Sequence, residues 1–473
     1  MGGERWWTKV VDTVEAKKQI KYAMPMVMTN VTFYLIPVVS VMFVGHLGEL
    51  QLAASTLANS WANVTGYAIM SGLSIALETL CGQAFGAKHY KLLGIYLQTS
   101  CLISFIFSIL ISILWWFTKP ILIILLRQNP EVSNEAVVYI RYLIPGIFAF
   151  GMLQNIMRFL QTQSVVWPLV FCSLVPLLLQ IGIVAIVFHC TTLGFRGAAL
   201  AVSITFWISL ALLLVYVRYS GTLKRSWNGF TKEIFRFVVT NLKLALTSTT
   251  MLCLEYWAFE AVIILAGLMP NSKASTSLVA MCLFTVGISY NLMYGLSAAA
   301  STRVSNELGA MRPDRAKNAM CVAMKLAAML MAVIVLSIGF GREKWAHLFS
   351  DDADIIKLFA SMTPLLCTSI AFDSIQCILS ETNTSAQNKN FRPQRRNPSG
   401  YLFNSQCVYF GMAIPVGCLL AFKLHLHAKG LWIGLICGIG FQSGAIFVAT
   451  CLKKWVAFEQ PSHGSNHLRA TSA

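Results

Sequence analysis

The chain has little charge for its length. Of its 473 residues, 12% are charged and 56% are hydrophobic, whereas a soluble domain carries about 25% charged residues. So low a share excludes an ordinary soluble protein and predicts an all-α membrane protein. Acidic residues are scarce as well, 19 against 36 basic ones. In a membrane protein this excess is typical of basic cytoplasmic loops, so we expect no nucleic-acid partner.

Signals of several other protein classes are also absent. The thirteen cysteines include no C-x-x-C pair, which argues against a disulfide framework and a metal site. No Gly-rich lysine loop of the Walker type occurs, so ATP is not the expected energy source. The first residues, MGGERWWTK, lack the apolar core of a secretory signal. No catalytic or metal-ligand spacing stands out, so we expect neither an enzyme nor a cofactor.

Long apolar runs fill most of the sequence. Windows of about 20 apolar residues predict about twelve membrane-spanning helices. The expected spans are residues 20–44, 55–77, 95–118, 137–159, 167–188, 196–218, 242–266, 277–300, 319–341, 356–380, 401–422 and 430–452. Basic residues fall mainly after even-numbered spans, although Arg342, Lys344 and Lys357 reduce the contrast. This pattern predicts that both termini are cytoplasmic.

Two segments of the chain repeat each other without gaps. Residues 72–87 (GLSIALETLCGQAFGA) align with residues 295–310 (GLSAAASTRVSNELGA) at an offset of 295 − 72 = 223. An offset of six spans preserves orientation, so it predicts two pseudo-symmetric six-helix lobes related by an axis along the membrane normal. The expected parts are a tail (1–19), an N-lobe (20–219), a linker (220–241), a C-lobe (242–452) and a second tail (453–473).

Two acidic residues lie inside apolar spans, Glu255 in the seventh and Asp373 in the tenth. A carboxylate near the bilayer centre costs roughly 2.5–3.5 kcal/mol, so such residues usually face a water-filled cavity. The repeat places apolar Phe33 opposite Glu255 and Gly151 opposite Asp373. The pair therefore belongs to the second lobe alone. Proximity would couple the protonation of the two carboxyls; a role in helix packing is the alternative.

Further polar and aromatic residues are candidates for a solute cavity. Aromatic rings attract planar cations, although packing and interfacial anchoring are alternative roles for them. The candidates are Trp257, Tyr290, Tyr294 and Gln376. Glu78 directly follows the second expected span, and we expect it to cap that helix or to solvate the cytoplasmic loop after it.

Four segments together resemble the multidrug and toxic compound extrusion (MATE) family, in its plant DETOXIFICATION branch. They are MFVGHLGEL (42–50), ETLCGQAFGA (78–87), CLEYWAFE (253–260) and GLWIGLICG (430–438). The resemblance covers nearly the whole chain. It implies two six-helix lobes around a V-shaped cavity and antiport of organic solutes against protons or sodium. It also implies that Glu255 and Asp373 form the ion-coupling site.

The chain departs from the family pattern at two places. Thr247 stands where the family usually has a proline, eight residues before the seventh-span Glu. Residues 381–400 are polar and basic, where the family has a short turn of small residues. This segment is either a divergent cytoplasmic loop or intron-derived sequence from a mistaken gene model. In the second case the chain is an inactive or mis-spliced product.

These observations predict a monomeric, proton-coupled antiporter that exports organic solutes by alternating access. Cationic compounds and secondary metabolites are the expected solutes, and sodium is the alternative coupling ion. One alternative is an ion-independent lipid or oligosaccharide flippase, which would have a basic cavity, whereas the expected cavity residues here include acids. A receptor or channel is another alternative, and the internal duplication argues against it. We expect a multi-pass protein of the vacuolar or plasma membrane.

Overall fold

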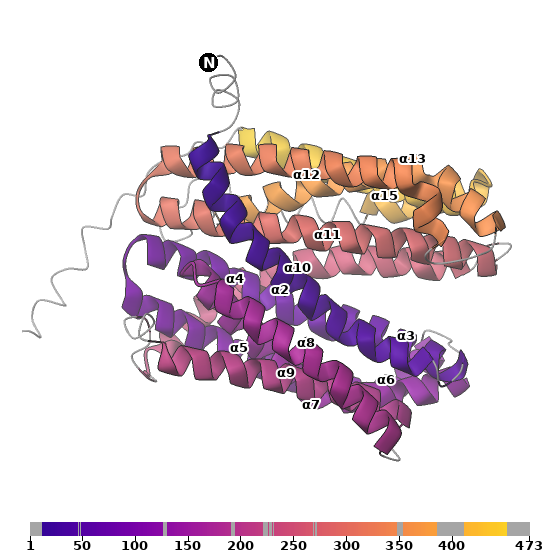
Figure 1. Ribbon diagram of the computed structural model, residues 1–473, viewed down its shortest axis with the longest axis horizontal. Helices are drawn as coiled ribbons and strands as arrows, with labels where there is room; N and C mark the ends of the chain where they lie inside the picture. Colours follow the sequence, from indigo (N-terminus) through magenta and orange to yellow (C-terminus); the bar gives the residue numbers. More distant parts are fainter. Residues whose placement is uncertain are drawn as a thin grey trace, which may run out of the picture.

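The computed structural model describes residues 12–45, 47, 49–125, 130–190, 194–220, 226, 229, 231–267, 269, 272–347, 353–385 and 411–451. All regular secondary structure in these residues is helical (Figure 1). The first half contains α2 (Thr13–Gly45), α3 (Glu49–Ala62), η1 (Asn63–Tyr67), α4 (Ala68–Gly86), α5 (Tyr90–Trp116), α6 (Thr118–Pro120), η2 (Ile121–Leu125), α7 (Pro130–Thr162), α8 (Trp167–Cys190) and α9 (Gly194–Tyr219). The second contains α10 (Ile234–Gly267), α11 (Ser272–Gly309), α12 (Pro313–His347), α13 (Ala353–Ser385), η4 (Leu419–Lys423) and α15 (His427–Cys451).

Eleven helical segments within the described residues are long and apolar enough to cross a membrane. Each corresponds to one expected span, with α3, η1 and α4 joined into the second. The expected span 401–422 is described only from residue 411, where a shorter apolar helix runs to Lys423. Residues 386–400 of the atypical segment and both tails, apart from Asp12 and residues 13–19, lie outside the described residues.

Several helices run further than the hydropathy pattern predicts, and two of these extensions contain residues of the candidate site. The second span was expected to end at residue 77, but α4 continues to Gly86. The tenth was expected to end at residue 380, but α13 continues to Ser385, so residues 381–385 are helical and not loop. Polar residues extend both helices because an intrahelical backbone stays hydrogen-bonded whether its side chains are apolar or polar.

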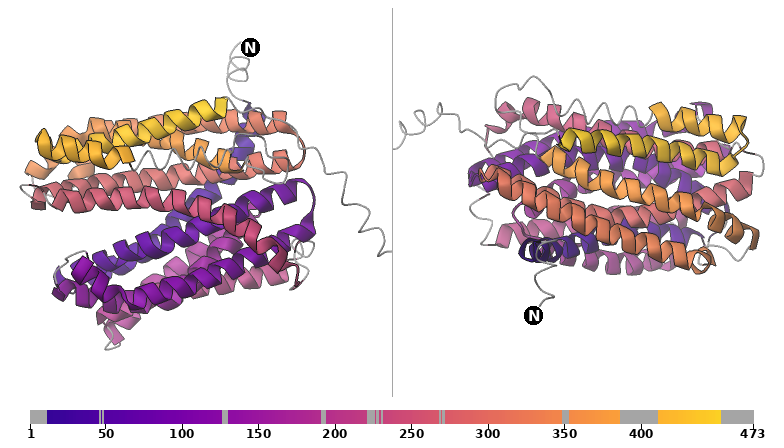
Figure 2. Two further views of the ribbon diagram at one scale, coloured as in Figure 1. Left: turned by 180° about the vertical axis from the view of Figure 1, so that it is seen from behind. Right: turned by 90° about the horizontal axis from the view of Figure 1, so that it is seen from above.

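Each lobe is built around its own apolar core. One large cluster of buried side chains draws on α2 to α9 and the start of α10, and a second draws on α10 to α15. The lobes lie close together at the end where α2 begins and diverge toward the opposite end (Figures 1 and 2). Helix α2 crosses from one lobe to the other, packing on α8 of the N-lobe and on α11 of the C-lobe.

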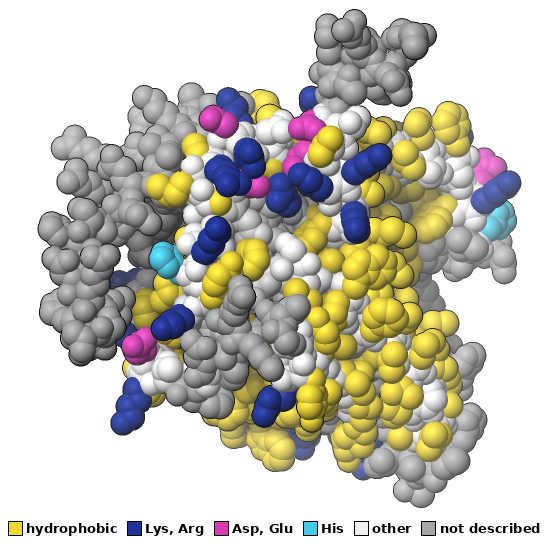
Figure 3. All heavy atoms as spheres, turned by 60° about the vertical axis from the view of Figure 1, so that its left-hand side comes forward, with side chains coloured by type: hydrophobic (Ala, Val, Ile, Leu, Met, Phe, Trp, Pro, Cys, Tyr) yellow, Lys and Arg dark blue, Asp and Glu magenta, His cyan; other side chains and the backbone are white. Residues whose placement is uncertain are grey.

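Side chains of opposite character divide the molecular surface. Lys and Arg gather at the end of the bundle where the chain connects α4 to α5, α7 to α8 and α11 to α12 (residues 87–89, 163–166 and 310–312), here called the basic end (Figure 3). A broad apolar surface covers the sides of the bundle (Figure 3). Large exposed apolar side chains are frequent among the described residues; Phe340, for example, is 89% exposed. Such a surface is typical of a protein whose sides face lipid tails.

The repeated segments pack against each other near the basic end and form the contact between the lobes that is here called the seam (residues 78–86 of α4 and 301–309 of α11). A Cβ atom added to Gly86 would lie 2.1 Å from the Asn306 carbonyl oxygen, and one added to Gly309 would lie 2.2 Å from that of Gln83. Only glycine permits so close an approach of two helix backbones. The repeat-related Gly86 and Gly309 thus close the seam from both sides.

Candidate functional site

The two intramembrane acids come from two different helices of the C-lobe. Glu255 lies on α10 and Asp373 on α13. Asp373 is only 6% exposed, and its carboxyl interacts electrostatically with that of Glu255. The side chain of Gln376, one turn after Asp373, is within hydrogen-bonding reach of the Glu255 carboxyl. The structure therefore brings together the two acids that the sequence singles out.

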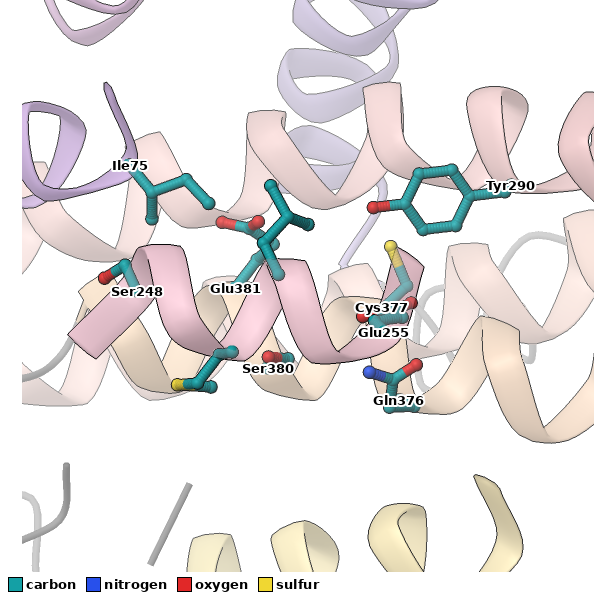
Figure 4. Close-up of a pocket in the computed structure, with 10 residues that line it drawn as sticks. Ile75, Ser248, Glu255, Tyr290, Gln376, Cys377, Ser380 and Glu381 are labelled. Carbon is teal, nitrogen blue, oxygen red and sulfur yellow. The ribbon is translucent and has the colours of Figure 1, made fainter. Parts of the chain in front are cut away.

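Glu255 borders a small cavity between α10, α11, α13 and α4 (Figure 4). Its volume of about 40 Å³ has room for a few water molecules, which is enough for ions and protons but too little for an organic solute. The lining residues are Ile75, Ser248, Met251, Leu252, Glu255, Tyr290, Gln376, Cys377, Ser380 and Glu381. The cavity thus joins Glu255 to a second acid, Glu381, two turns along α13 from Asp373.

The expected solute-contact residues do not all reach this cavity. Tyr290 and Gln376 line it (Figure 4). Tyr294 stacks on Tyr290 at a ring-centroid distance of 5.7 Å and accepts a hydrogen bond from Arg158. Trp257 is 43% exposed, and its indole N–H donates to the Val64 carbonyl across the lobes at 3.3 Å. Their contact with a solute stays a prediction.

Glu78 occupies a different place from the one expected for it. The sequence puts it at the end of a span, but it lies inside α4 and is 1% exposed. The Arg158 guanidinium on α7 donates to Glu78 Oε2 at 2.6 Å, and the Arg158 side chain is 5% exposed. An isolated buried charge costs several kcal/mol, and pairing compensates this cost. The expectation at this position is wrong because α4 extends two turns beyond its apolar run.

Two side chains of the C-lobe complete the environment of this ion pair. The Ser301 hydroxyl on α11 donates to Glu78 Oε1 at 2.6 Å. Arg158 Nη2 donates to the Tyr294 hydroxyl, and the guanidinium carbon lies 5.4 Å from the centre of that ring. Glu78, Arg158, Tyr294 and Ser301 are here called the inter-lobe network. Glu381 lies within electrostatic reach of Glu78 and Arg158.

Sequence reasoning missed Arg158 and Glu381 as members of a buried site. Arg158 falls one residue before the expected end of the fourth span and Glu381 one residue after that of the tenth, so both read as loop-facing charges. The repeat held a usable signal. Its offset of 222–223 places Arg158 opposite Ser380 or Glu381, and Glu78 opposite Ser301. Transporter sites lie at the interface between repeats, so polar residues at related positions are candidates for such a site.

Comparison with known proteins decides the family. A family model described as MatE matches residues 25–186 and 248–391, which is more than half of the chain. The chain belongs to the MATE family. Protein DETOXIFICATION 18 of Arabidopsis thaliana is 49% identical over 447 residues, which cover 94% of this chain and 93% of that protein. Protein DETOXIFICATION 16 of the same plant is 38% identical over 463 residues, with coverage of 97% and 92%.

A solved structure agrees with this membership. The crystal structure of the eukaryotic MATE transporter AtDTX14 superposes with a TM-score of 0.88 at 33% identity, covering 94% of this chain and 97% of that one. The expected fold, an all-α multi-span protein of the MATE type, is confirmed. The chain is thus a MATE transporter and a homologue of the plant DETOXIFICATION proteins, and not an enzyme.

Proposed function

We propose that this MATE transporter is a proton-coupled antiporter that exports organic solutes, with Glu255 and Asp373 as the coupling site. The observation that carries the proposal is their arrangement. The Glu255 carboxyl borders a cavity of water size inside the membrane-spanning bundle and interacts with the Asp373 carboxyl of another helix. Interacting carboxyls take up and release protons as a pair, so the binding of one proton depends on the state of both groups.

The coupling energy is sufficient for useful accumulation. One pH unit supplies about 1.4 kcal/mol per proton, and a membrane potential adds roughly 2.3 kcal/mol per charge per 100 mV. The intramembrane groups of the C-lobe at the proposed coupling site are acidic rather than basic, which favours cationic solutes. The proposal includes a monomer in the vacuolar or plasma membrane with both termini in the cytoplasm, which the basic residues of the α4–α5 and α11–α12 connections support.

Uptake into reconstituted vesicles tests the proposal. With an acidic vesicle interior, wild-type protein should accumulate a fluorescent organic cation such as ethidium, and dissipation of the pH gradient should abolish the uptake. Glu255→Gln with Asp373→Asn should reduce gradient-driven uptake to the level of protein-free vesicles, because neither amide takes up a proton at these pH values.

Glu260→Gln is the matched control, because this carboxyl lies on the same helix but does not line the cavity; its partner is Ser60 of α3. Uptake by the control should stay near that of the wild type. Gradient-driven uptake that survives in the double variant would contradict the coupling role. Uptake driven by a sodium gradient at equal pH would show that the coupling ion is sodium and not the proton.

A further inference from the structure

The inter-lobe network joins the two lobes in the part of the molecule where they lie closest. Glu78 and Arg158 belong to the N-lobe, and Tyr294 and Ser301 belong to α11 of the C-lobe. Arginine keeps its charge in proteins, so separation of α11 from α4 would leave a buried ion pair short of two hydrogen bonds. Hydrogen bonds to charged groups are the stronger class. The network therefore opposes opening of the lobes at this end.

The position of the network along the helices supports this interpretation. Glu78, Gly82 and Gly86 follow one another at intervals of four residues, so they lie on one face of α4. A Cβ at Gly82 would meet Ser305 of α11 at 2.1 Å, and one at Gly86 would meet Asn306. The buried ion pair thus lies behind a tight contact of Gly82 with the Ser305 side chain and a tight contact of Gly86 with the Asn306 backbone.

Two structural connections lead from this network to the proposed coupling site. The cavity beside Glu255 also borders Glu381, whose carboxyl is within electrostatic reach of Glu78 and Arg158. Tyr290 lines the same cavity and stacks on Tyr294, which bonds Arg158. The Nε atom of Arg158 is buried without a hydrogen-bond partner among the described residues, so the guanidinium retains a free donor for a further acceptor.

We propose that the inter-lobe network holds the seam closed, and that the protonation of Glu381, which shares a cavity with Glu255, sets the strength of the network. The first half of this inference stands alone, and the second rests on the proposed function. Arg158 and Glu381 are positioning residues here, because neither is proposed to touch the solute.

The charges around Glu381 explain the direction of the effect. The titratable or charged groups that face it are Glu78 of α4, Arg158 of α7, Glu255 of α10, Tyr290 and Tyr294 of α11, and Cys377 of α13. With Glu381 neutral, Glu78 and Arg158 form a cluster without net charge. An ionised Glu381 adds an uncompensated negative charge to a buried site, which is unfavourable unless water enters. Loss of the proton therefore favours opening of the seam.

Hydrogen exchange of the full protein in lipid nanodiscs tests the first half. Tyr294→Phe removes only the hydroxyl that bonds Arg158, and Ser301→Ala only the one that bonds Glu78. Each should lower the protection of backbone amides in residues 83–90 and 305–312 by on the order of ten-fold, because each loses a hydrogen bond to a charged group. Tyr67→Phe is the matched control, since this N-lobe hydroxyl is buried without a partner among the described residues. Wild-type protection in both seam variants would overturn the proposal.

The pH dependence of the same amides tests the second half. Compared as protection factors, the wild-type seam should be about ten-fold more protected at pH 5.5 than at pH 8, and Glu381→Gln should remove this difference while it keeps the high protection. A difference that persists in Glu381→Gln would overturn the role of this residue. No transport is needed for these measurements. If the wild type lacks gradient-driven uptake but Tyr294→Phe lowers the protection of the seam, only the proton antiport is overturned. If the wild type transports but neither seam variant changes this protection, only the role of the network is overturned.

Discussion

Individual buried charges in this protein are compensated by partners from other helices. Arg158 is the clearest case, because its guanidinium has a carboxylate on α4 and a hydroxyl on α11. Breaking such a pair by removing one partner costs about 3–5 kcal/mol, whereas the intact pair adds little net stability over apolar residues. A buried ion pair is therefore weak evidence for a stabilising role. Its place at the contact between the lobes, where Tyr294 and Ser301 of α11 bond it, supports the proposed role in holding the seam closed.

Asp12 caps the start of α2, and the stability that it contributes should depend on pH. Its Oδ1 accepts the backbone N–H groups of Val14 and Glu15 at 3.1 Å each, and Oδ2 accepts from Asn318 Nδ2 of α12 at 3.0 Å. The hydrogen bond from the Glu15 N–H, followed by the one from Asn318, holds the pKa of this carboxyl below its usual value. A lowered pKa in the folded state means that the ionised carboxylate stabilises the fold, and that this contribution is lost as pH falls through the lowered pKa.

Asp12→Ala should accordingly lower the melting temperature at pH 7, because the first turn of α2 loses its cap. The deficit relative to wild type should stay constant down to about pH 5 and shrink below about pH 4, as the pH falls from the ordinary pKa of an aspartate through the lowered pKa of Asp12. Asp12→Asn is the control, since its amide oxygen still caps the helix and does not titrate in this range. Thermal unfolding across this pH range measures both differences, and a deficit of Asp12→Ala that is unchanged at pH 3 would contradict the role of the charge.

At the scale of helices, the hydropathy pattern predicts which segments span the membrane but not where they end. Eleven described helices match expected spans, because about 20 apolar residues are needed to cross the hydrocarbon core. The ends of α4 and α13 are different because polar residues there are buried between the lobes instead of entering water. Hydropathy registers Glu78 and Glu381 as polar, and it contains no information on the partner that a distant helix supplies.

The sequence likewise predicts one part of the candidate site and misses another part. The sequence identifies Glu255 and Asp373, since their cost inside an apolar span is independent of neighbours. It does not identify Arg158, and it names Tyr294 only as a candidate for solute contact. The bond between these two residues depends on the contact between α7 and α11, and the bonded residues are 136 positions apart. Pairing the repeat positions comes closest, since it already placed Glu78 opposite Ser301.

The pair α4 and α11 leads to a prediction about helix packing. In Gly309→Ala the new methyl group would lie 2.2 Å from the Gln83 carbonyl oxygen, so the two helices must move apart at the seam. Overpacking of this kind typically costs about 1–3 kcal/mol. We expect a lower melting temperature and faster hydrogen exchange in residues 83–90.

Gly339→Ala is the matched control for this variant. It also lies inside a long helix, α12, but a Cβ there has no neighbour within 4 Å. Alanine is favoured over glycine in helices by about 1 kcal/mol, so this variant should melt at or slightly above the wild-type temperature. Equal destabilisation by both substitutions would show that the seam is not specially close-packed.

For the molecule as a whole, the pseudo-symmetry axis passes through the inter-lobe network. Glu78 and Ser301 are separated by 223 residues, which is the offset of the repeat, and their side chains bond each other. Gly82 and Ser305 have the same separation and are also in contact. Residues related by a two-fold operation meet each other only beside its axis. The two lobes thus contact through equivalent faces of α4 and α11, and the charge lies on one side only.

Exchange of the two residues tests this geometry. Glu78→Ser alone leaves Arg158 buried without its carboxylate and should destabilise the protein by about 3–5 kcal/mol. Ser301→Glu alone places two carboxylates side by side and should be destabilising too. The double exchange, Glu78→Ser with Ser301→Glu, restores one carboxylate and one hydroxyl at nearly the same place, so its melting temperature should exceed that of both single variants. The Arg158 ion pair would then join the N-lobe to the C-lobe, and opening of the seam would have to break it. A double variant that is no more stable than either single variant would show that the two positions are not equivalent across the axis. If it is well folded, we expect the double variant to transport more slowly than the wild type.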